Sequence, residues 1–263
     1  MDQPVATLPT GKAMPLFGLG TWALRGNGAY QALLWALESG YRHFDTATMY
    51  RNEAELGRAL RDSPVARADV FITTKLPPHE AGNERRTLER SLSALGVDHV
   101  DLWLVHWPPN GAGVDTWTEF ARLAEEGLAG AIGVSNYSPG QIDELIDKTG
   151  VVPAVNQIRW SPFIFDGERL EHSRSRGVVL EGYSPFRSAN LAHPLLAELG
   201  GRYGKTPAQV ILRWHLDHGV AVIPKSARRE RFDSNIDVFD FSLTLEEVAA
   251  VDRLSGKSRF ARN

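Results

Sequence analysis

Residues 40–53 read GYRHFDTATMYRNE, and within this stretch a short run with buried-strand character passes into a polar loop. The run 41–44 has the length and aromatic content of a strand. Asp45 follows it directly, and Tyr50 comes five residues later. A loop of that length can fold back and hold a phenol above a carboxylate rooted at the strand end. The stretch therefore predicts a strand that delivers two groups suited to proton chemistry.

Two later strand-like runs also end in a polar side chain. Residues 70–74 are followed by Lys75, and residues 101–105 are followed by His106. A lysine directly after a buried strand either extends its ammonium to solvent or pairs with a carboxylate. A lone histidine at such a point more often has a structural role than a catalytic one.

Together these four side chains would form a proton-donating site. A phenol has a pKa near ~10, so it needs a nearby ammonium to act as an acid at neutral pH. Lys75 would be that ammonium, Asp45 would hold it by an ion pair, and His106 would offer a ring N–H to a carbonyl oxygen. The structural alternative is that Asp45 caps the following helix and Tyr50 packs on its loop.

The chain as a whole alternates short apolar runs with amphipathic helical stretches, which is typical of repeated βα units. The runs occupy residues 16–19, 42–44, 70–74, 101–105, 131–134, 154–156, 178–182 and 220–223. Eight such units predict an α/β fold, the TIM (β/α)8 barrel. Residues 5–8 and 13–15 predict an N-terminal hairpin, and residues 195–203 predict one of the extra helices in the C-terminal part. No linker or repeat divides the sequence, so we expect one domain over residues 1–263.

A polar or hydrogen-bonding side chain follows every one of these runs. The residues are Thr21, Asp45, Lys75, His106, Ser135, Asn136, Gln157, Tyr183 and Lys225. The C-terminal ends of the strands form the active face of a TIM barrel, so these side chains would surround one opening.

The composition excludes several classes of function. The 263 residues contain 29 basic and 32 acidic side chains in a mixed pattern, with no basic stripe for a nucleic acid. There is no cysteine, which excludes disulfides and thiolate metal sites. The histidines lack metal-ligand spacing, so no metal is predicted. Neither a signal segment nor a membrane span is evident, and we expect a cytoplasmic monomer.

Several strings resemble signatures of the aldo-keto reductase family. They lie in residues 40–53, in 73–76 (TTKL) and in 104–108 (LVHWP), and the resemblance extends from about Leu16 to Leu254. Residues 225–241 are most similar to the bacterial branch that contains the 2,5-diketo-D-gluconate reductases. The resemblance implies a catalytic tetrad in which the tyrosine gives a proton to the substrate oxygen and the histidine orients the carbonyl: Asp45, Tyr50, Lys75 and His106.

Hydride chemistry also needs a carrier, because no side chain supplies a hydride. No G-x-G-x-x-G follows a strand, so a Rossmann domain is not predicted. Hydroxyl and amide side chains at strand ends can pair with a nicotinamide carboxamide, although they can equally cap loops, and Tyr183 can equally be an ordinary packed tyrosine. The resemblance implies that the nicotinamide and pyrophosphate part of the cofactor contacts Thr21, Trp22, Ser135, Asn136, Gln157, Tyr183, Ser184 and Ser188.

The polar, cationic opening of the helix after the last strand predicts a phosphate site. Cations at a helix N-terminus oppose the helix dipole unless an anion binds there. The resemblance assigns the adenosine 2′-phosphate to Lys225, Ser226 and Arg231, and the adenine to Arg228 and Asn235. Ser234 stands where the family usually has glutamate. Because of the predicted 2′-phosphate site, NADPH is the expected cofactor, in preference to NADH.

An apolar wall is expected around the mouth of the site, formed by Trp22, Met49, Trp107 and Trp160, with core packing as the alternative for Trp160. Pro77 stands where many members of the family have tryptophan, and the loop 108–115 is shorter than in many members. These differences suggest an open pocket for aldehydes, dicarbonyls or keto-sugar acids. These expectations describe a carbonyl reductase, and two other functions are alternatives to it. One is a cofactor-sensing aldo-keto reductase-like binding protein with little turnover. The other is an aldolase or isomerase that uses Lys75 as a Schiff-base nucleophile, which requires a lysine without a carboxylate partner.

Overall fold

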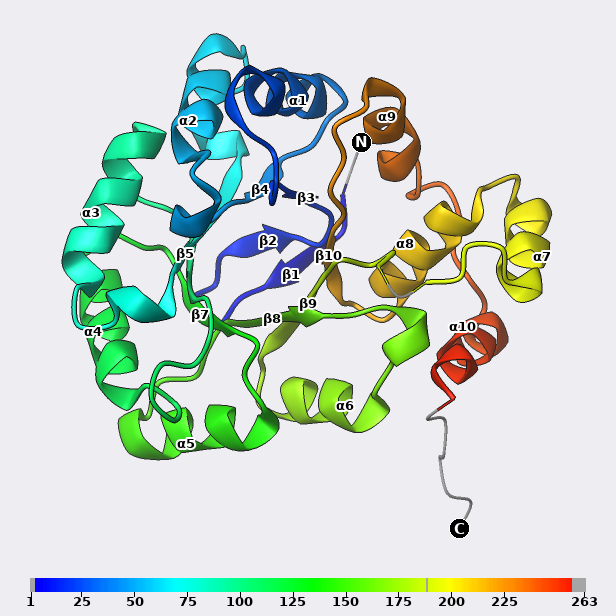
Figure 1. The fold of residues 1–263 in the computed structure, drawn as a ribbon. Coiled ribbons are helices and arrows are strands. Elements are labelled where there is room, and N and C mark those ends of the chain that lie inside the picture. Colours follow the sequence, from blue (N-terminus) through cyan, green and yellow to red (C-terminus); the bar gives the residue numbers. More distant parts are fainter. Residues whose placement is uncertain (1–2, 188, 257–263) are drawn as a thin grey trace.

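The computed structural model describes residues 3–187 and 189–256. Over these residues eight parallel strands form one sheet that curls into a barrel, which confirms the predicted TIM-barrel fold (Figure 1). In chain order the strands are β3 (Leu19–Gly20), β4 (His43–Asp45), β5 (Phe71–Leu76), β6 (Leu102–Val105), β7 (Ile132–Ser135), β8 (Val155–Arg159), β9 (Val179–Tyr183) and β10 (Ala221–Ile223).

The barrel closes between its first and last strands. Phe17 forms a parallel bridge with Val222, and the Gly18 N–H donates to the Val222 carbonyl at 2.9 Å. The Gly20 N–H donates to the Pro224 carbonyl at 3.3 Å. A Cβ at Gly20 would lie 2.8 Å from the Ile223 carbonyl oxygen, so this close approach requires glycine.

Helices surround the barrel on the outside (Figure 1). They are α1 (Gly26–Glu38), α2 (Glu53–Asp62), α3 (Glu84–Leu95), α4 (Val114–Glu125), α5 (Pro139–Thr149), α6 (Gly167–Ser175), α7 (Pro194–Tyr203), α8 (Pro207–Asp217), α9 (Arg229–Ile236) and α10 (Leu245–Asp252). Capping boxes begin α5, α8 and α10, in which the side chains of Ser138, Thr206 and Thr244 each accept from the backbone N–H three residues later. The predicted extra helix is α7, which follows the long connection after β9.

Six of the eight strands extend further towards the C-terminus than predicted, whereas β6 and β10 end at the predicted residue. The first was predicted at 16–19, but its ladder with β4 pairs only Leu19 and Gly20. Asp45, Lys75, Ser135, Gln157 and Tyr183 were expected just after their strands, and all five lie inside them. The boundaries differ because a polar residue that faces the interior of the barrel can keep its backbone in the ladder.

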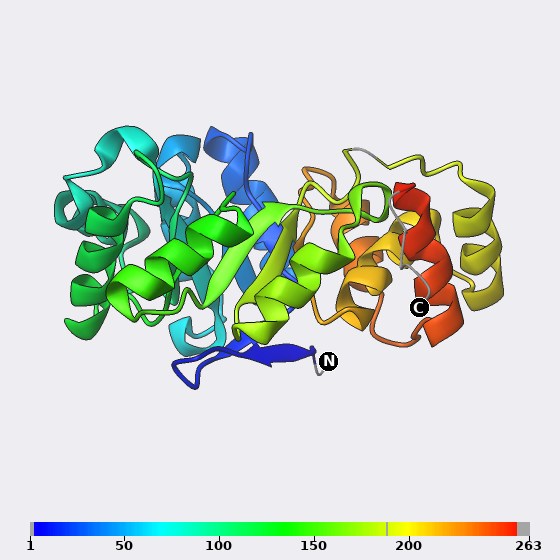
Figure 2. The same ribbon diagram turned by 90° about the horizontal axis from the view of Figure 1, so that it is seen from below.

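The hairpin of β1 (Val5–Thr7) and β2 (Ala13–Pro15) closes the N-terminal end of the barrel (Figure 2). Met14 is fully buried there, and the His43 ring at the start of β4 contacts the Pro15 carbonyl oxygen. The hairpin plugs one end of the barrel. The other end, where the strands terminate, remains available for a site.

Candidate active site

The side chains of Lys75 and Asp45 form a buried ion pair at the ends of neighbouring strands. Lys75 Nζ lies 2.7 Å from Asp45 Oδ1 and donates to the Thr46 carbonyl oxygen at 2.8 Å. Burial acts to lower the pKa of Lys75, but Asp45 and Tyr50 outweigh it, so the pKa is raised. The ammonium therefore keeps its proton, which disfavours a Schiff-base role for this lysine.

Tyr50 lies above this pair at the end of the short 3-10 turn Thr48–Tyr50. Lys75 Nζ is 5.0 Å from the centroid of its ring. Burial raises the pKa of the Tyr50 phenol, and Lys75 only partly opposes this effect. Lys75 acts to lower the pKa of the Tyr50 phenol, as expected. Burial has the larger and opposite effect, so the net pKa is raised.

The His106 ring completes this group of four. It stacks on Trp107 with ring centroids 4.1 Å apart and meets the Tyr50 ring edge-on at 5.7 Å. Burial, with a contribution from Lys75, lowers the pKa of His106 to about 2. The imidazole is therefore neutral and can offer one ring N–H as a hydrogen-bond donor.

A cavity of about 320 Å³ opens over these side chains at the C-terminal end of the barrel. It is lined by Gly20, Trp22, Asp45, Met49, Tyr50, His106, Trp107, Ser135, Asn136, Gln157, Tyr183, Ser184, Arg187, Ile223 and Lys225. Most of the polar residues predicted to surround one opening are therefore brought together. Lys75 lies fully buried just below the cavity, and Thr21 is also buried, with Asn52 donating to its carbonyl oxygen at 2.9 Å.

Hydrogen bonds fix the amide of Asn136 in the cavity wall. Its Nδ2 donates to the His106 carbonyl at 3.1 Å and to Ser135 Oγ at 3.0 Å, while its Oδ1 accepts from the Tyr183 hydroxyl at 2.9 Å. Asn136 and Ser184 both have a positive φ, of 65° and 53°. Such conformations cost energy and are often found at ligand sites.

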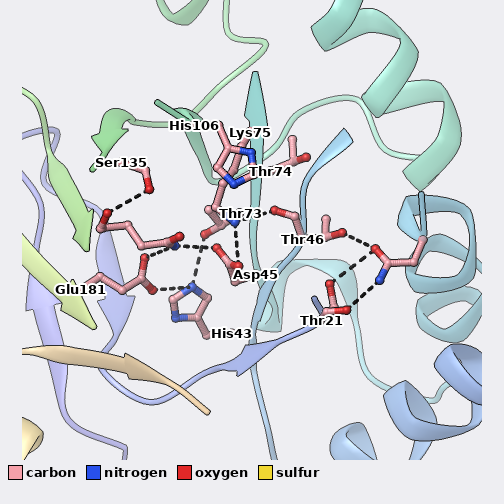
Figure 3. A network of polar contacts seen from close by, with 12 residues as sticks. Thr21, His43, Asp45, Thr46, Thr73, Thr74, Lys75, His106, Ser135 and Glu181 are labelled. Atoms are coloured by element: carbon pink, nitrogen blue, oxygen red, sulfur yellow. Dashed lines mark hydrogen bonds and ion pairs between the residues drawn. The ribbon is translucent and has the colours of Figure 1, made fainter. Parts of the chain in front are cut away.

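Gln157 connects the Asp45–Lys75 ion pair to a second acidic side chain, Glu181, which was not predicted from the sequence. Its Nε2 lies 2.7 Å from Asp45 Oδ2 and 2.8 Å from Glu181 Oε2 (Figure 3). Glu181 is completely buried in β9. A signal was present in the sequence, because Glu181 is two residues before Tyr183 and so faces the same side of the strand.

The cationic segment that leads into α9 reaches the cavity at Lys225. Lys225 lines the cavity, whereas Ser226 is buried and accepts the Arg228 N–H at 3.1 Å. Among the described residues no ion pair engages Lys225, Arg228 or Arg231, although the neighbouring Arg229 pairs with Glu38. Uncompensated cations at a helix N-terminus attract an anion such as a phosphate group. Asn235 lies buried on the same helix.

The predicted substrate residue Trp160 does not line the cavity. Trp160 was expected in the substrate wall, but it is only 1% exposed and packs against Phe165 and Trp214 on the outer side of the barrel wall. The correction follows from strand alternation: Trp160 is three residues after Gln157, so its side chain faces the opposite side. Ser188 lies outside the described residues.

Neither a metal site nor a membrane helix is found in the part of the chain that the structure describes. No group of three acidic or histidine side chains there is arranged to hold a metal ion. No helix over residues 3–187 and 189–256 is long and apolar enough to cross a membrane.

Comparison with known proteins agrees with this geometry. Residues 16–255 match the aldo/keto reductase family. The chain is 41% identical to 2,5-diketo-D-gluconic acid reductase B of a Corynebacterium species, over 95% of this chain and 93% of that protein. The crystal structure of an aldo/keto reductase from Brucella melitensis superposes with a TM-score of 0.94 at 38% identity, covering 97% and 98% of the two chains. A Bombyx mori aldo-keto reductase in complex with NADP gives a TM-score of 0.90 at 34% identity, covering 97% and 93%.

Proposed function

Because the chain belongs to the aldo/keto reductase family, we propose that it reduces the carbonyl groups of small aldehydes, dicarbonyls or keto-sugar acids with NADPH. The observation that carries this proposal is the buried Asp45–Lys75 pair beneath Tyr50 and His106, at the floor of a cavity of about 320 Å³. Such a floor holds a proton donor and a neutral hydrogen-bond donor at the same point.

Tyr50 is the proposed proton donor. When its phenol gives a proton to the carbonyl oxygen, the phenolate that forms lies beside the Lys75 ammonium. Asp45 keeps that ammonium charged and in place. The raised pKa of free Tyr50 means that the phenol carries its proton at neutral pH, as a proton donor must.

His106 is proposed to orient the substrate. Its pKa of about 2 leaves the imidazole neutral at any physiological pH, so it can donate a hydrogen bond but does not supply a proton. The stacking of its ring on Trp107 restricts its orientation. Substrate oxygen would thus meet two donors, one that transfers its proton and one that only polarises the carbonyl.

NADPH supplies the hydride when it is bound. The residues proposed to hold its nicotinamide end are Thr21, Trp22, Ser135, Asn136, Gln157, Tyr183 and Ser184, and Ser188 belongs to the same proposal. Lys225, Ser226 and Arg231 would bind its adenosine 2′-phosphate, and Arg228 and Asn235 would contact its adenine. The exposed aromatic rings of Trp22 and Trp107, with Met49, would contact substrate.

A steady-state assay tests the proposal. Purified protein is mixed with NADPH and a panel of aldehydes, vicinal dicarbonyls and keto-sugar acids, and the absorbance of the reduced cofactor is followed. We expect oxidation of NADPH with several members of the panel. Tight binding of NADPH without turnover of any carbonyl would instead favour a cofactor-sensing role. Trapping of substrate on Lys75 by borohydride would contradict the mechanism.

A further inference from the structure

Glu181 is a buried acidic side chain to which the proposed reaction gives no role. It belongs to β9, where its Cα is in register with Gln157 on β8 and with Ala221 on β10. Its side chain is completely buried inside the barrel, next to His43 and Gln157 (Figure 3). A carboxyl group at this depth must either be paired with a cation or carry a proton.

The contacts of Gln157 show what Glu181 does to its neighbour. An amide nitrogen has two N–H groups, and those of Gln157 go to Asp45 Oδ2 at 2.7 Å and to Glu181 Oε2 at 2.8 Å. Both donors are therefore used inside the barrel, and Oε1 is the polar atom left to face the cavity that Gln157 lines. Rotation of the amide by half a turn would place its oxygen against the Asp45 carboxylate.

The hydrogen bonds of His43 fix the protonation of Glu181. His43 Nδ1 lies 3.0 Å from the Pro15 carbonyl oxygen, which can only accept, so Nδ1 carries the ring proton. Nε2 is then a lone-pair acceptor that faces Thr73 Oγ1 at 3.2 Å and Glu181 Oε1 at 3.5 Å. Glu181 Oε1 has no hydrogen-bond partner among the described residues. A carboxylate oxygen there would be repelled by that lone pair, whereas a proton on Oε1 would remove the repulsion.

The His43 ring packs closely against the backbone at Gly18. A Cβ built at Gly18 would lie 2.8 Å from atoms of the ring, which shows how closely the backbone packs against it. Burial also lowers the pKa of His43 to about 4, so its contact with Glu181 is not an ion pair. Glu181 therefore has no cationic partner on this side.

We propose that Glu181 is a positioning residue that holds its proton and, together with Asp45, occupies both N–H groups of Gln157, so that Gln157 Oε1 is presented to the cofactor cavity as a fixed acceptor. The matching group is an amide N–H donor, and the nicotinamide carboxamide carries one. This inference rests on the proposed function, because it assigns the nicotinamide to that cavity.

A binding experiment without turnover tests the role. Dissociation constants are measured by titration calorimetry for NADP⁺ and for adenosine 2′,5′-bisphosphate, which lacks the nicotinamide, with the wild type, Glu181→Met and Glu181→Gln. Methionine has similar length and only a weakly accepting thioether sulfur, so one Gln157 N–H loses its strong acceptor. We expect NADP⁺ affinity to fall on the order of tenfold in Glu181→Met, and affinity for the bisphosphate to stay within about twofold.

Glu181→Gln should restore NADP⁺ affinity to within about threefold of wild type, because an amide reproduces the acceptor and donor of a protonated carboxyl. Leu180→Met is the matched control, since Leu180 packs on the outer side of the same strand, and it should leave both affinities unchanged. Equal loss for both ligands in Glu181→Met, no loss at all, or a Glu181→Gln variant as weak as Glu181→Met would overturn the proposal.

Two further results keep the test decisive. If wild-type protein binds neither ligand, the proposed cofactor function fails, which is distinct from failure of the Glu181 assignment. If Glu181→Met does not fold, infrared spectroscopy replaces it: the wild type should show the carbonyl stretch of a buried protonated carboxylic acid at neutral pH, and Glu181→Gln should lack it. Absence of that band from the wild type would overturn the proposal.

Discussion

Lys75 Nζ lies 2.7 Å from Asp45 Oδ1, and neither side chain is more than 2% exposed to solvent. The two residues come from neighbouring strands, and the Thr46 carbonyl oxygen accepts a second bond from the ammonium. A buried pair of this kind adds little net stability, but removal of one partner leaves an uncompensated charge in the interior.

Lys75→Met should therefore destabilise the fold by about 3–5 kcal/mol, because it strands the Asp45 carboxylate. Urea denaturation measures this loss in free energy of unfolding. The double variant Asp45→Asn/Lys75→Met should recover part of the loss. A double variant less stable than Lys75→Met would show that the stranded charge is not the cause.

Tyr50→Phe should lower turnover by at least ~10²-fold, as loss of a general acid usually does, and should change NADPH affinity little. Steady-state kinetics and cofactor titration separate the two effects. Tyr30→Phe is a suitable control because that exposed phenol bonds Asp62 on the outer helices, 2.7 Å away. Tyr50→Phe with turnover close to that of Tyr30→Phe would contradict the proposed proton donor.

Cofactor selectivity should depend on Lys225 and Arg231, whose charges no described acidic side chain compensates. Replacement of both by alanine should weaken NADPH binding by at least ~10-fold and leave NADH binding almost unchanged, because only NADPH has the 2′-phosphate. Arg229→Ala is the control, since Arg229 pairs with Glu38. Equal loss for NADH and NADPH in the double variant would argue against a phosphate site.

Stability should fall with rising pH because of Glu181. Burial, and then Asp45, raise its pKa to about 8 from an ordinary value of 4.5, while Gln157 and Lys75 act in the opposite direction and His43 stays neutral. The folded state therefore binds more protons than the unfolded state between these values, so the free energy of unfolding decreases from about pH 4.5 to about pH 8. Thermal melts should show a smaller decrease for Glu181→Gln. Identical slopes for the two proteins would contradict this assignment.

Trp22 should govern the choice of substrate. Its side chain is 60% exposed at the mouth of the cavity, so Trp22→Ala should change KM differently among carbonyl substrates while leaving the melting temperature nearly unchanged. Trp160→Ala should do the reverse, with a loss of about 3–5 kcal/mol in stability. A uniform effect of Trp22→Ala on all substrates would place substrate elsewhere.

The barrel and most of its cavity wall were predictable because both depend on repeated local patterns. Each strand is short and apolar, and each polar residue at its end must face the same opening in a parallel barrel. Asp45, His106 and Gln157 could thus be brought together from order along the chain alone. The capping boxes were equally local, since their donors and acceptors lie within one helical turn.

What could not be predicted depends on which side of a strand a residue faces and on contacts across the barrel. Trp160 was predicted to line the cavity because it is a large aromatic residue. Its position three residues after Gln157 directs its side chain to the outer side of the barrel wall, where it is buried. Glu181 was overlooked because its partners, Gln157 and His43, are 24 and 138 residues away in the chain. The net pKa of Tyr50 also needed the structure, because the extent of burial decides its sign.

The seam between β3 and β10 has a consequence for how the molecule is assembled. It joins segments about two hundred residues apart, such as Phe17 and Val222, so its formation carries the largest loop-closure entropy in the barrel. Gly20 and Lys225 line the cavity from opposite sides of that seam. Without this seam the eight strands would be joined by seven ladders only, and the cavity would be open along one side. A cofactor that contacts both sides should therefore stabilise the pairing of β3 with β10 during refolding. Its presence should also slow the separation of these two strands during unfolding.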